Sequence, residues 1–379
     1  MNQNSTLIQM ARPIFTEKAA RVIAAEIRNG AIATGPLVLR LEEQLAQQFQ
    51  HAHVAACSNG TAALHAALFA LGVKAGDCVV TTALSFVASA SAIVHAGATP
   101  VFCDIDDSYN LDPERLEQAI TRLRRAGRRV SAVVFVHLYG NPTNVARVQA
   151  ICRKHEVPLL EDCAQAHGAQ LANRGVAHFG EIATFSFYAT KNIAAGEGGA
   201  VVSSDPALVE RVRKFINHGR TSAYEHEFVG YNYRMTNLHA ALALDQLEQF
   251  ESNLARRTAN SEHFRSAFAA ISALRLPRVE PGARHAMHQF TVIVPPESRD
   301  PLAAHLLADG IRSAVVYPTP LPYLKCFESL RPAQEDSFER ARAASTSCLS
   351  IPVHPMLERG DLVRIVDSMI RFFPTGASR

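Results

Sequence analysis

Short apolar runs alternate with amphipathic segments between residues 54 and 204. Apolar runs bounded by turn-forming residues predict buried strands, whereas apolar residues three or four positions apart predict helices. The predicted strands are 54–57, 78–82, 100–105, 130–136, 157–160, 182–188 and 200–204. Because strands alternate with helices at this spacing, the pattern predicts an α/β fold with a mostly parallel sheet and helices on both faces.

The helices of this part are predicted from amphipathic spacing and from their end signals. Asp112 before Pro113 is typical of a helix start, and Gly72 is typical of a helix end. Residues 1–35 are interpreted as a lead-in arm that contains one helix. The predicted helices are 17–28, 39–49, one that ends at Gly72, 87–95, 113–123, 145–155, 206–218 and one that begins near Thr236.

A change of composition at residues 251–257 marks a predicted domain boundary. We therefore expect a large domain over residues 1–250 and a small C-terminal domain over residues 251–379. The small domain is predicted to be α+β. Its expected elements are a long helix, strands at 274–279, 289–294 and 311–317, and helices at 301–309 and 361–372.

Composition and charge exclude several classes of protein. A chain of 379 residues with 48% hydrophobic residues is long enough for two domains, and 19% charged residues argue against disorder. The net charge of +3 gives no nucleic-acid or membrane signature. Residues 79–103 lack Asp, Glu, Lys and Arg, but their small polar residues, Gly97 and Pro100 favour strand-helix-strand over a membrane span.

Cysteine usage and the N-terminus indicate a cytoplasmic protein. The seven cysteines form no C-x-x-C pair and are expected to be reduced and mostly buried. The first residues lack a charged head followed by a long apolar run, so no secretory signal is expected.

Candidate chemistry lies at the ends of two predicted strands. Residues 157–160 end on Glu161 and Asp162, and residues 182–188 end shortly before Lys191. A lysine that holds an aldehyde as a Schiff base, with a carboxylate that keeps a ring nitrogen protonated, is what pyridoxal phosphate (PLP) requires. Taken singly, Asp162 could equally be a structural acid and Lys191 a surface lysine.

Two other strand ends carry features that suit the same cofactor. The turn 58–61 enters a helix, whose free N–H groups and dipole favour an anion such as a phosphate. Simple capping by Ser58 or Asn59 is the alternative. Phe86 follows the next strand, where its ring can stack on a flat ligand or pack into the core.

Three competing sites find little support. No G-x-x-x-x-G-K-[ST] motif occurs, so a standard P-loop is excluded. Histidine pairs such as His51 and His53 lack the H-E-x-x-H pattern and cysteine pairs of metal sites, so no metal is expected. Cys163 as a nucleophile beside His167 is disfavoured because its side chain is expected to point back into the sheet layer.

The segments EDCAQAHGA and FSFYATKNIAAGEGGA, residues 161–169 and 185–200, resemble the DegT/DnrJ/EryC1/StrS family of PLP-dependent sugar aminotransferases. The resemblance implies the type I fold of PLP-dependent transferases, like that of aspartate aminotransferase, with a seven-stranded sheet in the large domain. It also implies a homodimer with no nucleic-acid or membrane partner, in which Lys191 and Asp162 are catalytic.

The resemblance further implies roles for other residues. Tyr317 would contact the substrate. The cofactor would be bound by Gly60 and Thr61 at its phosphate, Phe86 on its ring, Gln165 at its phenolic oxygen, His167 in support of Asp162, Ser186 at the phosphate, and Asn232 reaching across the dimer.

The implied reaction moves an amino group from glutamate or glutamine to a keto-sugar, usually nucleotide-linked, in amino-sugar biosynthesis. The chain departs from the family where Val316 replaces the usual histidine before Tyr317, and where Pro322 replaces a second one. A non-sugar ketone as acceptor, and a PLP-binding regulatory protein without turnover, therefore stay open. Lys191 argues against the dehydratase branch, which has a histidine there.

Overall fold

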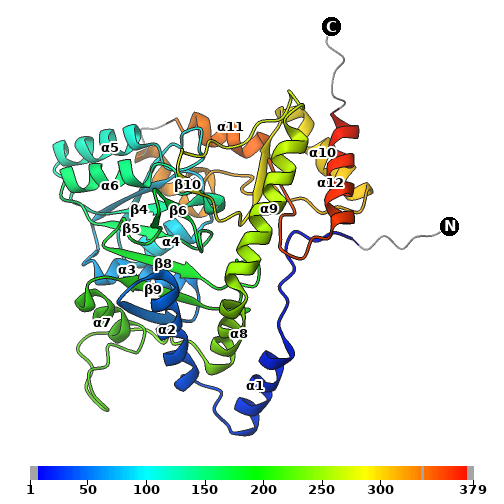
Figure 1. The fold of residues 1–379 in the computed structure, drawn as a ribbon. Helices are drawn as coiled ribbons and strands as arrows, with labels where there is room; N and C mark the ends of the chain where they lie inside the picture. Colours follow the sequence, from blue (N-terminus) through cyan, green and yellow to red (C-terminus); the bar gives the residue numbers. More distant parts are fainter. Residues whose placement is uncertain (1–6, 334–336, 374–379) are drawn as a thin grey trace.

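The computed structural model describes residues 7–333 and 337–373 (Figure 1). The predicted arm thus lies outside the described residues over its first six positions. The described chain contains a seven-stranded sheet in the order β1-β9-β8-β5-β4-β2-β3. Its strands are β1 His53–Cys57, β2 Cys78–Thr82, β3 Thr99–Cys103, β4 Val130–Val136, β5 Leu159–Asp162, β8 Ile182–Ser186 and β9 Gly199–Ser203.

The sheet is mostly parallel, as predicted. β3, β2, β4, β5 and β8 pair in parallel, whereas β9 pairs antiparallel with both β8 and β1. Ligands of such sheets bind beyond the carboxyl ends of the parallel strands. The ends of β5 and β8 are neighbours in this sheet, so the residues that follow them are placed at one edge.

Helices cover both faces of the sheet because alternate strand residues are apolar on each side. On one face, α2 and α8 pack on residues such as Val54 and Phe185, and α5 and α6 pack on Val133. On the other face, α3, α4 and α7 pack on residues such as Val134. These helices are α2 Pro36–Phe49, α3 Gly60–Ala70, α4 Ala88–His95, α5 Pro113–Arg125, α6 Val145–Lys154, α7 Pro206–Phe215 and α8 Asn237–Glu248.

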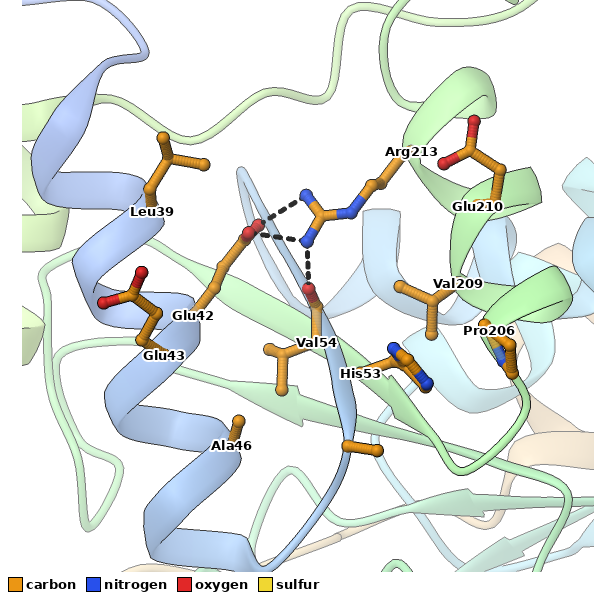
Figure 2. Close-up of a pocket in the computed structure, with 11 residues that line it drawn as sticks. Leu39, Glu42, Glu43, Ala46, His53, Val54, Pro206, Val209, Glu210 and Arg213 are labelled. Atoms are coloured by element: carbon orange, nitrogen blue, oxygen red, sulfur yellow. Dashed lines mark hydrogen bonds and ion pairs between the residues drawn. The ribbon is translucent and has the colours of Figure 1, made fainter.

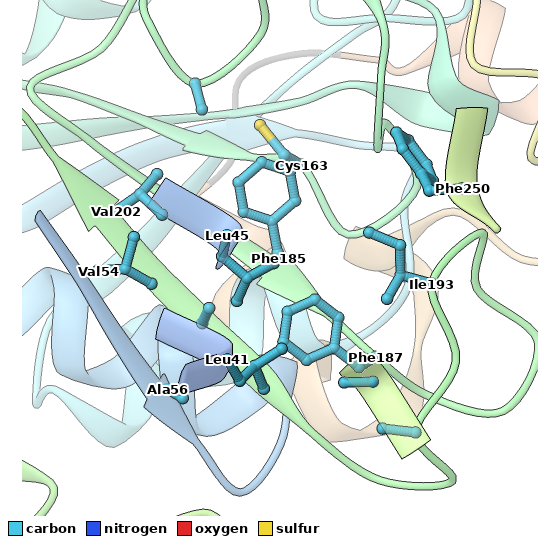
Figure 3. Close-up of a cluster of buried hydrophobic side chains, with 14 of the residues drawn as sticks. Leu41, Leu45, Val54, Ala56, Cys163, Phe185, Phe187, Ile193, Val202 and Phe250 are labelled. Carbon is cyan, nitrogen blue, oxygen red and sulfur yellow. The ribbon is translucent and has the colours of Figure 1, made fainter. Parts of the chain in front are cut away.

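The cluster of buried side chains beneath α2 shows how this packing is built (Figure 3). Leu41 and Leu45 of α2 are fully buried against strand residues that include Val54, Phe185 and Val202. Burying a leucine side chain stabilises a fold by about 1.5–3 kcal/mol. Cys163 belongs to the same cluster, so its thiol points into this layer as predicted.

The helix ends follow the predicted signals. Asp112 caps α5, because its Oδ1 accepts a hydrogen bond from the N–H of Glu114 at 2.8 Å. Thr236 caps α8 in the same way. Gly72 adopts φ +80 just after α3, where a residue with a side chain would be strained. Capping of this kind contributes about 1 kcal/mol to each helix.

The C-terminal part has a hydrophobic core of its own. The strands β11 Phe290–Ile293 and β12 Cys348–Ile351 pair antiparallel, and α9 Phe250–Phe268 runs from the region of α8 to the C-terminal helices (Figure 1). One buried cluster consists of Ile8 together with residues between 264 and 369. The other helices of this part are α10 Pro296–Ala308, α11 Glu339–Ser347 and α12 Arg359–Phe372.

The N-terminal arm connects the two parts. Its helix α1, Glu17–Arg28, begins at Thr16, whose N–H donates to Asp245 of α8 at 3.1 Å. Upstream, Ile8 forms a bridge with Ile311 of the C-terminal part. Residues between these two contacts therefore connect α8 of the large-sheet part to the C-terminal part.

Two predicted strands of the C-terminal part are wrong. Segment 274–279 makes a single bridge, Arg275 to Ile293, because Pro277 has no N–H and Arg278 instead donates its N–H to Asp107. Segment 311–317 likewise makes only isolated bridges, at Ile311 and Ala314. The helix predicted at 301–309 begins five residues earlier, at Pro296.

Several short elements were not predicted. They are β12, α11, the small sheet of β6 Gln170–Leu171, β7 Arg174–Gly175 and β10 Ala283–Arg284, and the 3-10 helices η1 Leu138–Gly140, η2 Leu321–Tyr323 and η3 Lys325–Ala333. Among them, β10 and β12 pair with distant segments, and the helices and the hairpin of β6 and β7 are too short for a hydrophobic period to signal them.

The strand-helix-strand pattern predicted for residues 79–103 and the burial predicted for most cysteines are confirmed. Residues 79–103 fold as β2-α4-β3, and none of the helices in the described ranges is long and apolar enough to cross a membrane. All seven cysteines are free, and six of them are buried. Cys326 is the exposed one.

Candidate active site

Lys191 lies in the loop between β8 and β9, which folds back on the end of β8. The N–H of Lys191 donates to the carbonyl of Tyr188 at 2.8 Å, and Ala195 donates to Phe187 at 2.7 Å. Burial of the amine lowers the pKa of Lys191 to about 8, although the nearby carboxylate of Asp162 raises it. The fold thus holds an amine near Asp162 in an environment that disfavours its charged form.

Asp162 ends β5 and is buried. Ser89 of α4 donates its hydroxyl to Oδ2 at 2.9 Å, and the N–H of Ala164 donates to Oδ1 at 3.1 Å. Burial raises the pKa of Asp162, while these two hydrogen bonds and the charge of Lys191 oppose that rise. No ion pair of Asp162 is found among the described residues, so a cation beside this carboxylate would favour its ionised form.

Glu161 points to the opposite face of β5 and has a different environment. Its Oε2 lies 2.9 Å from Nε2 of His137, and both side chains are fully buried. The same carboxylate accepts the N–H groups of Ala177, Phe179 and Gly180 at 3.0, 2.7 and 2.7 Å. Glu161 therefore fixes the loop that follows β7 and has no free acceptor for a ligand.

The turn at the start of α3 meets the end of β8. Asn59 caps the helix by accepting the N–H of Ala62 at 2.9 Å, so the capping alternative is confirmed for Asn59. No described hydrogen bond uses the N–H groups of Gly60 and Thr61. A Cβ added to Gly60 would lie 2.8 Å from Cβ of Ser186, so only glycine allows this approach. The turn and Ser186 together form a cradle of hydrogen-bond donors.

An aromatic pair and an amide form a second group of contacts, made of Phe86, Tyr317 and Gln165. Phe86 is 56% exposed, and its ring centroid is 6.1 Å from that of Tyr317. Gln165 donates from Nε2 to the hydroxyl of Tyr317 at 3.1 Å, and its Oε1 accepts the N–H of Tyr139 at 2.6 Å. Phe86 is therefore not a core residue. Its accessible ring is available to a ligand.

His167 makes no hydrogen bond to Asp162 in the described chain, so it does not support that carboxylate directly. The role of Asn232 across a dimer stays a prediction. His167 lies among Phe49, Phe185 and Phe187, and its two ring nitrogens have no hydrogen-bond partner in the described chain. Burial lowers its pKa to about 3. The hydroxyl of Ser89, not His167, supports Asp162. Sequence reasoning missed Ser89.

Asn232 lies in an exposed segment and bridges to Asn217. No described contact joins it to Asp162, Gln165 or Lys191. Exposed apolar side chains flank it, since Tyr224 is 95% and Val229 93% exposed.

A buried group of His137, Glu161 and Cys163 was not foreseen. One atom from each lies within 4.8 Å of the others. Burial raises the pKa of the Cys163 thiol well above its usual value, and the neighbouring carboxylates of Glu161 and Asp162 add to the rise. A thiol of this kind is a poor nucleophile, which agrees with the sequence argument against Cys163.

Two cavities of the described chain differ in whether predicted site residues line them. One of about 290 Å³ borders Lys191 and Asn192, between the arm and α9. Another of about 480 Å³ lies between α2, β1 and α7 (Figure 2). In the second cavity Arg213 pairs with Glu42 at 2.6 Å, and none of the predicted site residues lines it. Of the predicted site residues, Lys191 alone lines the first cavity.

The chain matches a known family model and curated proteins over most of its length. The model of the DegT/DnrJ/EryC1/StrS aminotransferase family matches residues 13–370. The chain is 35% identical over 359 residues to a pleiotropic regulatory protein of Geobacillus stearothermophilus, covering 93% of this chain and 94% of that protein. It is 36% identical over 331 residues to a UDP-N-acetyl-3-dehydro-alpha-D-glucosamine 3-aminotransferase of Acidithiobacillus ferrooxidans, covering 86% and 85%.

The fold is also similar to solved structures. Spr1654 of Streptococcus pneumoniae, solved in its PLP-form, gives a TM-score of 0.89 at 27% sequence identity. The similarity covers 97% of this chain and 98% of that chain.

Proposed function

The chain belongs to the DegT/DnrJ/EryC1/StrS aminotransferase family, and on that premise we propose that it moves an amino group from glutamate or glutamine to a keto-sugar linked to a nucleotide. Membership makes it an aminotransferase that uses PLP on the type I fold. The observation that carries the proposal is that Lys191, whose pKa burial lowers to about 8, lies near the buried carboxylate of Asp162.

The residues present fit the cofactor. The open N–H groups of Gly60 and Thr61, with Ser186 beside them, suit its phosphate. The exposed ring of Phe86 suits its flat ring. Asp162, buried without an ion pair in the described chain, suits a protonated ring nitrogen.

Further roles are proposed for the remaining residues. Gln165 would contact the cofactor's phenolic oxygen, and Tyr317, held by Gln165, would face the substrate. His167, buried near Lys191, would pack beneath the cofactor site rather than contact Asp162. When bound, the cofactor supplies an aldehyde that carries the amino group and a ring that accepts an electron pair.

Lys191 would move the proton in this chemistry. An amine with a pKa of about 8 is neutral in about one tenth of molecules at pH 7, against fewer than about one in a thousand for a free lysine. The neutral amine can therefore take a proton from the donor carbon and return it elsewhere. Asp162 keeps its charge during this transfer, and Ser89 and the N–H of Ala164 hold its two oxygens in place.

A second copy of the chain would complete each site. Tyr224, Val229 and Tyr231 are exposed apolar residues on one segment, and such patches mark interfaces. In a homodimer, Asn232 of this segment would reach the phosphate site of the other copy. A solution mass of one chain for the protein with cofactor would contradict this.

The division into domains at residues 250 and 251 also remains a proposal. It is supported by the separate core of the C-terminal part. The seven unpaired cysteines support a cytoplasmic location.

The name of one relative and two departures from the family pattern bear on the nature of the acceptor. The relative from Acidithiobacillus ferrooxidans acts, by its name, on a 3-dehydro sugar linked to UDP. Val316 and Pro322 depart from the family pattern, so a non-sugar ketone is the alternative acceptor. A regulatory role like that named for the Geobacillus stearothermophilus relative would not require turnover. The amine and the carboxylate are both retained here, which favours turnover.

The test uses the two half-reactions separately. Glutamate or glutamine added to the protein with cofactor should convert it to the aminated form, with loss of its visible absorbance. Keto-sugar nucleotides are then screened for the one that restores the absorbance. If neither donor changes the spectrum, the proposed donors are wrong. If donors react and only non-sugar ketones restore the absorbance, the sugar acceptor is wrong.

A further inference from the structure

The cavity beside Lys191 is lined by positive charge. Arg12 of the arm and Arg256 and Arg257 of α9 join Lys191 around a space of about 290 Å³. No Asp or Glu is among its lining residues in the described chain. Proteins seldom gather cations around a cavity without an opposing charge, because their mutual repulsion destabilises the fold.

Arg257 is the least expected of these residues. It is only 7% exposed and makes no ion pair with a described residue. Its Nη1 donates to the carbonyls of Met287 and His288, at 3.1 and 3.5 Å. Burial lowers the pKa of Arg257 to about 10. A buried guanidinium without a carboxylate is costly unless something else compensates its charge.

The other nitrogens of Arg257 are available to a ligand. No described hydrogen bond uses Nε or Nη2, and neither atom is among the buried polar atoms that lack a partner. Arg257 is one of the residues that line the cavity. A planar guanidinium with free donors matches a carboxylate or a phosphate in two parallel hydrogen bonds.

His288 lies near both the Arg257 guanidinium and Lys191. It is buried, and the charges of Lys191 and Arg257 both lower its pKa, in addition to its burial. Both cations therefore lie close enough to His288 to disfavour its charged form. A ligand bound by Arg257 is held within reach of the loop that carries Lys191.

We propose that Arg257, with Arg12 and Arg256 at the rim, binds an oxyanion of a substrate in this cavity. The inference rests on the proposed function, because both substrates bring such a group to Lys191. The donor carries carboxylates, and the nucleotide-linked acceptor carries phosphates. The anion supplies the charge that the buried guanidinium lacks.

The experiment measures anion binding without turnover, on the protein with cofactor, so that the phosphate cradle is filled. Glutarate, a dicarboxylate without an amine, and inorganic pyrophosphate are titrated by calorimetry and by the shift of the unfolding temperature. Binding of glutarate assigns the cavity to the donor, and binding of pyrophosphate assigns it to the acceptor. Either affinity should fall as ionic strength rises.

Variants locate the binding. Arg257→Met should lower the affinity for the anion roughly ten- to a hundredfold, which is the loss expected for a charged hydrogen bond. Arg12 and Arg256 lie on the exposed rim, so Arg12→Gln and Arg256→Gln should each lower the affinity for the anion by roughly two- to fivefold. Arg257→Lys should restore part of the affinity. Arg125→Gln, which removes an exposed charge from α5, serves as the matched control and should change nothing.

Two results would overturn the proposal. In the first, neither anion binds. In the second, an anion binds the Arg257, Arg12 and Arg256 variants as tightly as it binds the wild type. If Arg257→Met fails to fold, the anion affinities of the Arg12→Gln and Arg256→Gln variants still test the proposal. Anion binding is measured without amino transfer, so a failed donor or acceptor screen does not affect this result.

Discussion

Glu161 and Asp162 are adjacent in β5, yet their carboxylates lie on opposite faces of the sheet and have opposite tasks. Glu161 pairs with His137 and accepts three backbone N–H groups. Asp162 faces α4, where Ser89 donates to it, and lies near Lys191. Because side chains alternate along a strand, one short strand supplies both a structural acid and the acid for which we propose a catalytic role.

The first prediction concerns stability at Glu161. Glu161→Gln removes the charge that pairs with His137, and we expect a loss of about 3 kcal/mol in the free energy of unfolding at pH 7. Chemical denaturation measures it. Asp107→Asn, at an exposed ion pair, is the control and should cost less than about 1 kcal/mol.

The second prediction concerns the pH dependence of that stability. Burial raises the pKa of Glu161, but the bond and charge of His137 and the backbone N–H groups outweigh it, so the pKa lies below 4.5. The stabilisation is therefore complete above the unfolded pKa of 4.5 and is lost as the pH falls through the lower folded pKa. Glu161→Gln should lack this part of the acid sensitivity. Parallel stability curves for both proteins below pH 4.5 would show that Glu161 does not contribute.

The third prediction separates catalysis from stability at Asp162. Burial raises the pKa of Asp162, so its charge costs stability in the protein without cofactor. Asp162→Asn should leave the unfolding temperature of that form unchanged or higher. It should slow amino transfer by roughly a hundredfold or more, because the electrostatic partner of the ring is lost. Amino transfer by Asp162→Asn at the wild-type rate would show that Asp162 takes no part in the reaction.

The fourth prediction tests the phosphate cradle. Gly60→Ala places a Cβ 2.8 Å from Cβ of Ser186 and should push the turn away from the phosphate. We expect cofactor affinity to fall by roughly tenfold, with a cost of about 1–3 kcal/mol in stability from overpacking. Gly360→Ala is the matched control, because a Cβ there meets nothing within 4 Å. Fluorescence titration of the cofactor compares the two, and equal affinities would contradict the assignment.

The sheet and its helices were predictable because they depend on local patterns. The strands of the sheet, the Asp112 cap and the carboxyl-end positions of Asp162 and Lys191 follow from apolar runs and turn residues. Segments 274–279 and 311–317 also look apolar, but their neighbours in space supply only isolated bridges. Strand formation there depends on partners that a local pattern does not reveal.

The site was predictable only in part, for the same reason. Two groups of these residues are in contact, Gly60 with Ser186, and Phe86 and Gln165 with Tyr317. Ser89 was missed because it contacts Asp162 from a helix that precedes it by 73 positions. The serines of SFVASAS, one helical turn apart at the predicted helix start, were the only available signal. The cavity at Arg257 combines residues from the arm, the loop and α9, so no motif contains it.

The most direct measurement is the covalent capture of PLP by Lys191, since every proposed role depends on that amine. Protein without cofactor is mixed with PLP over a range of pH, reduced with borohydride and mapped by mass spectrometry. Only a neutral amine attacks an aldehyde, so capture should rise with pH and be half-maximal near pH 8, the lowered pKa of Lys191. Lys191→Ala should show neither label nor amino transfer, whereas Lys154→Ala, at an exposed ion pair, should match the wild type. A reducible bond that persists in Lys191→Ala, or amino transfer at an undiminished rate, would contradict the account.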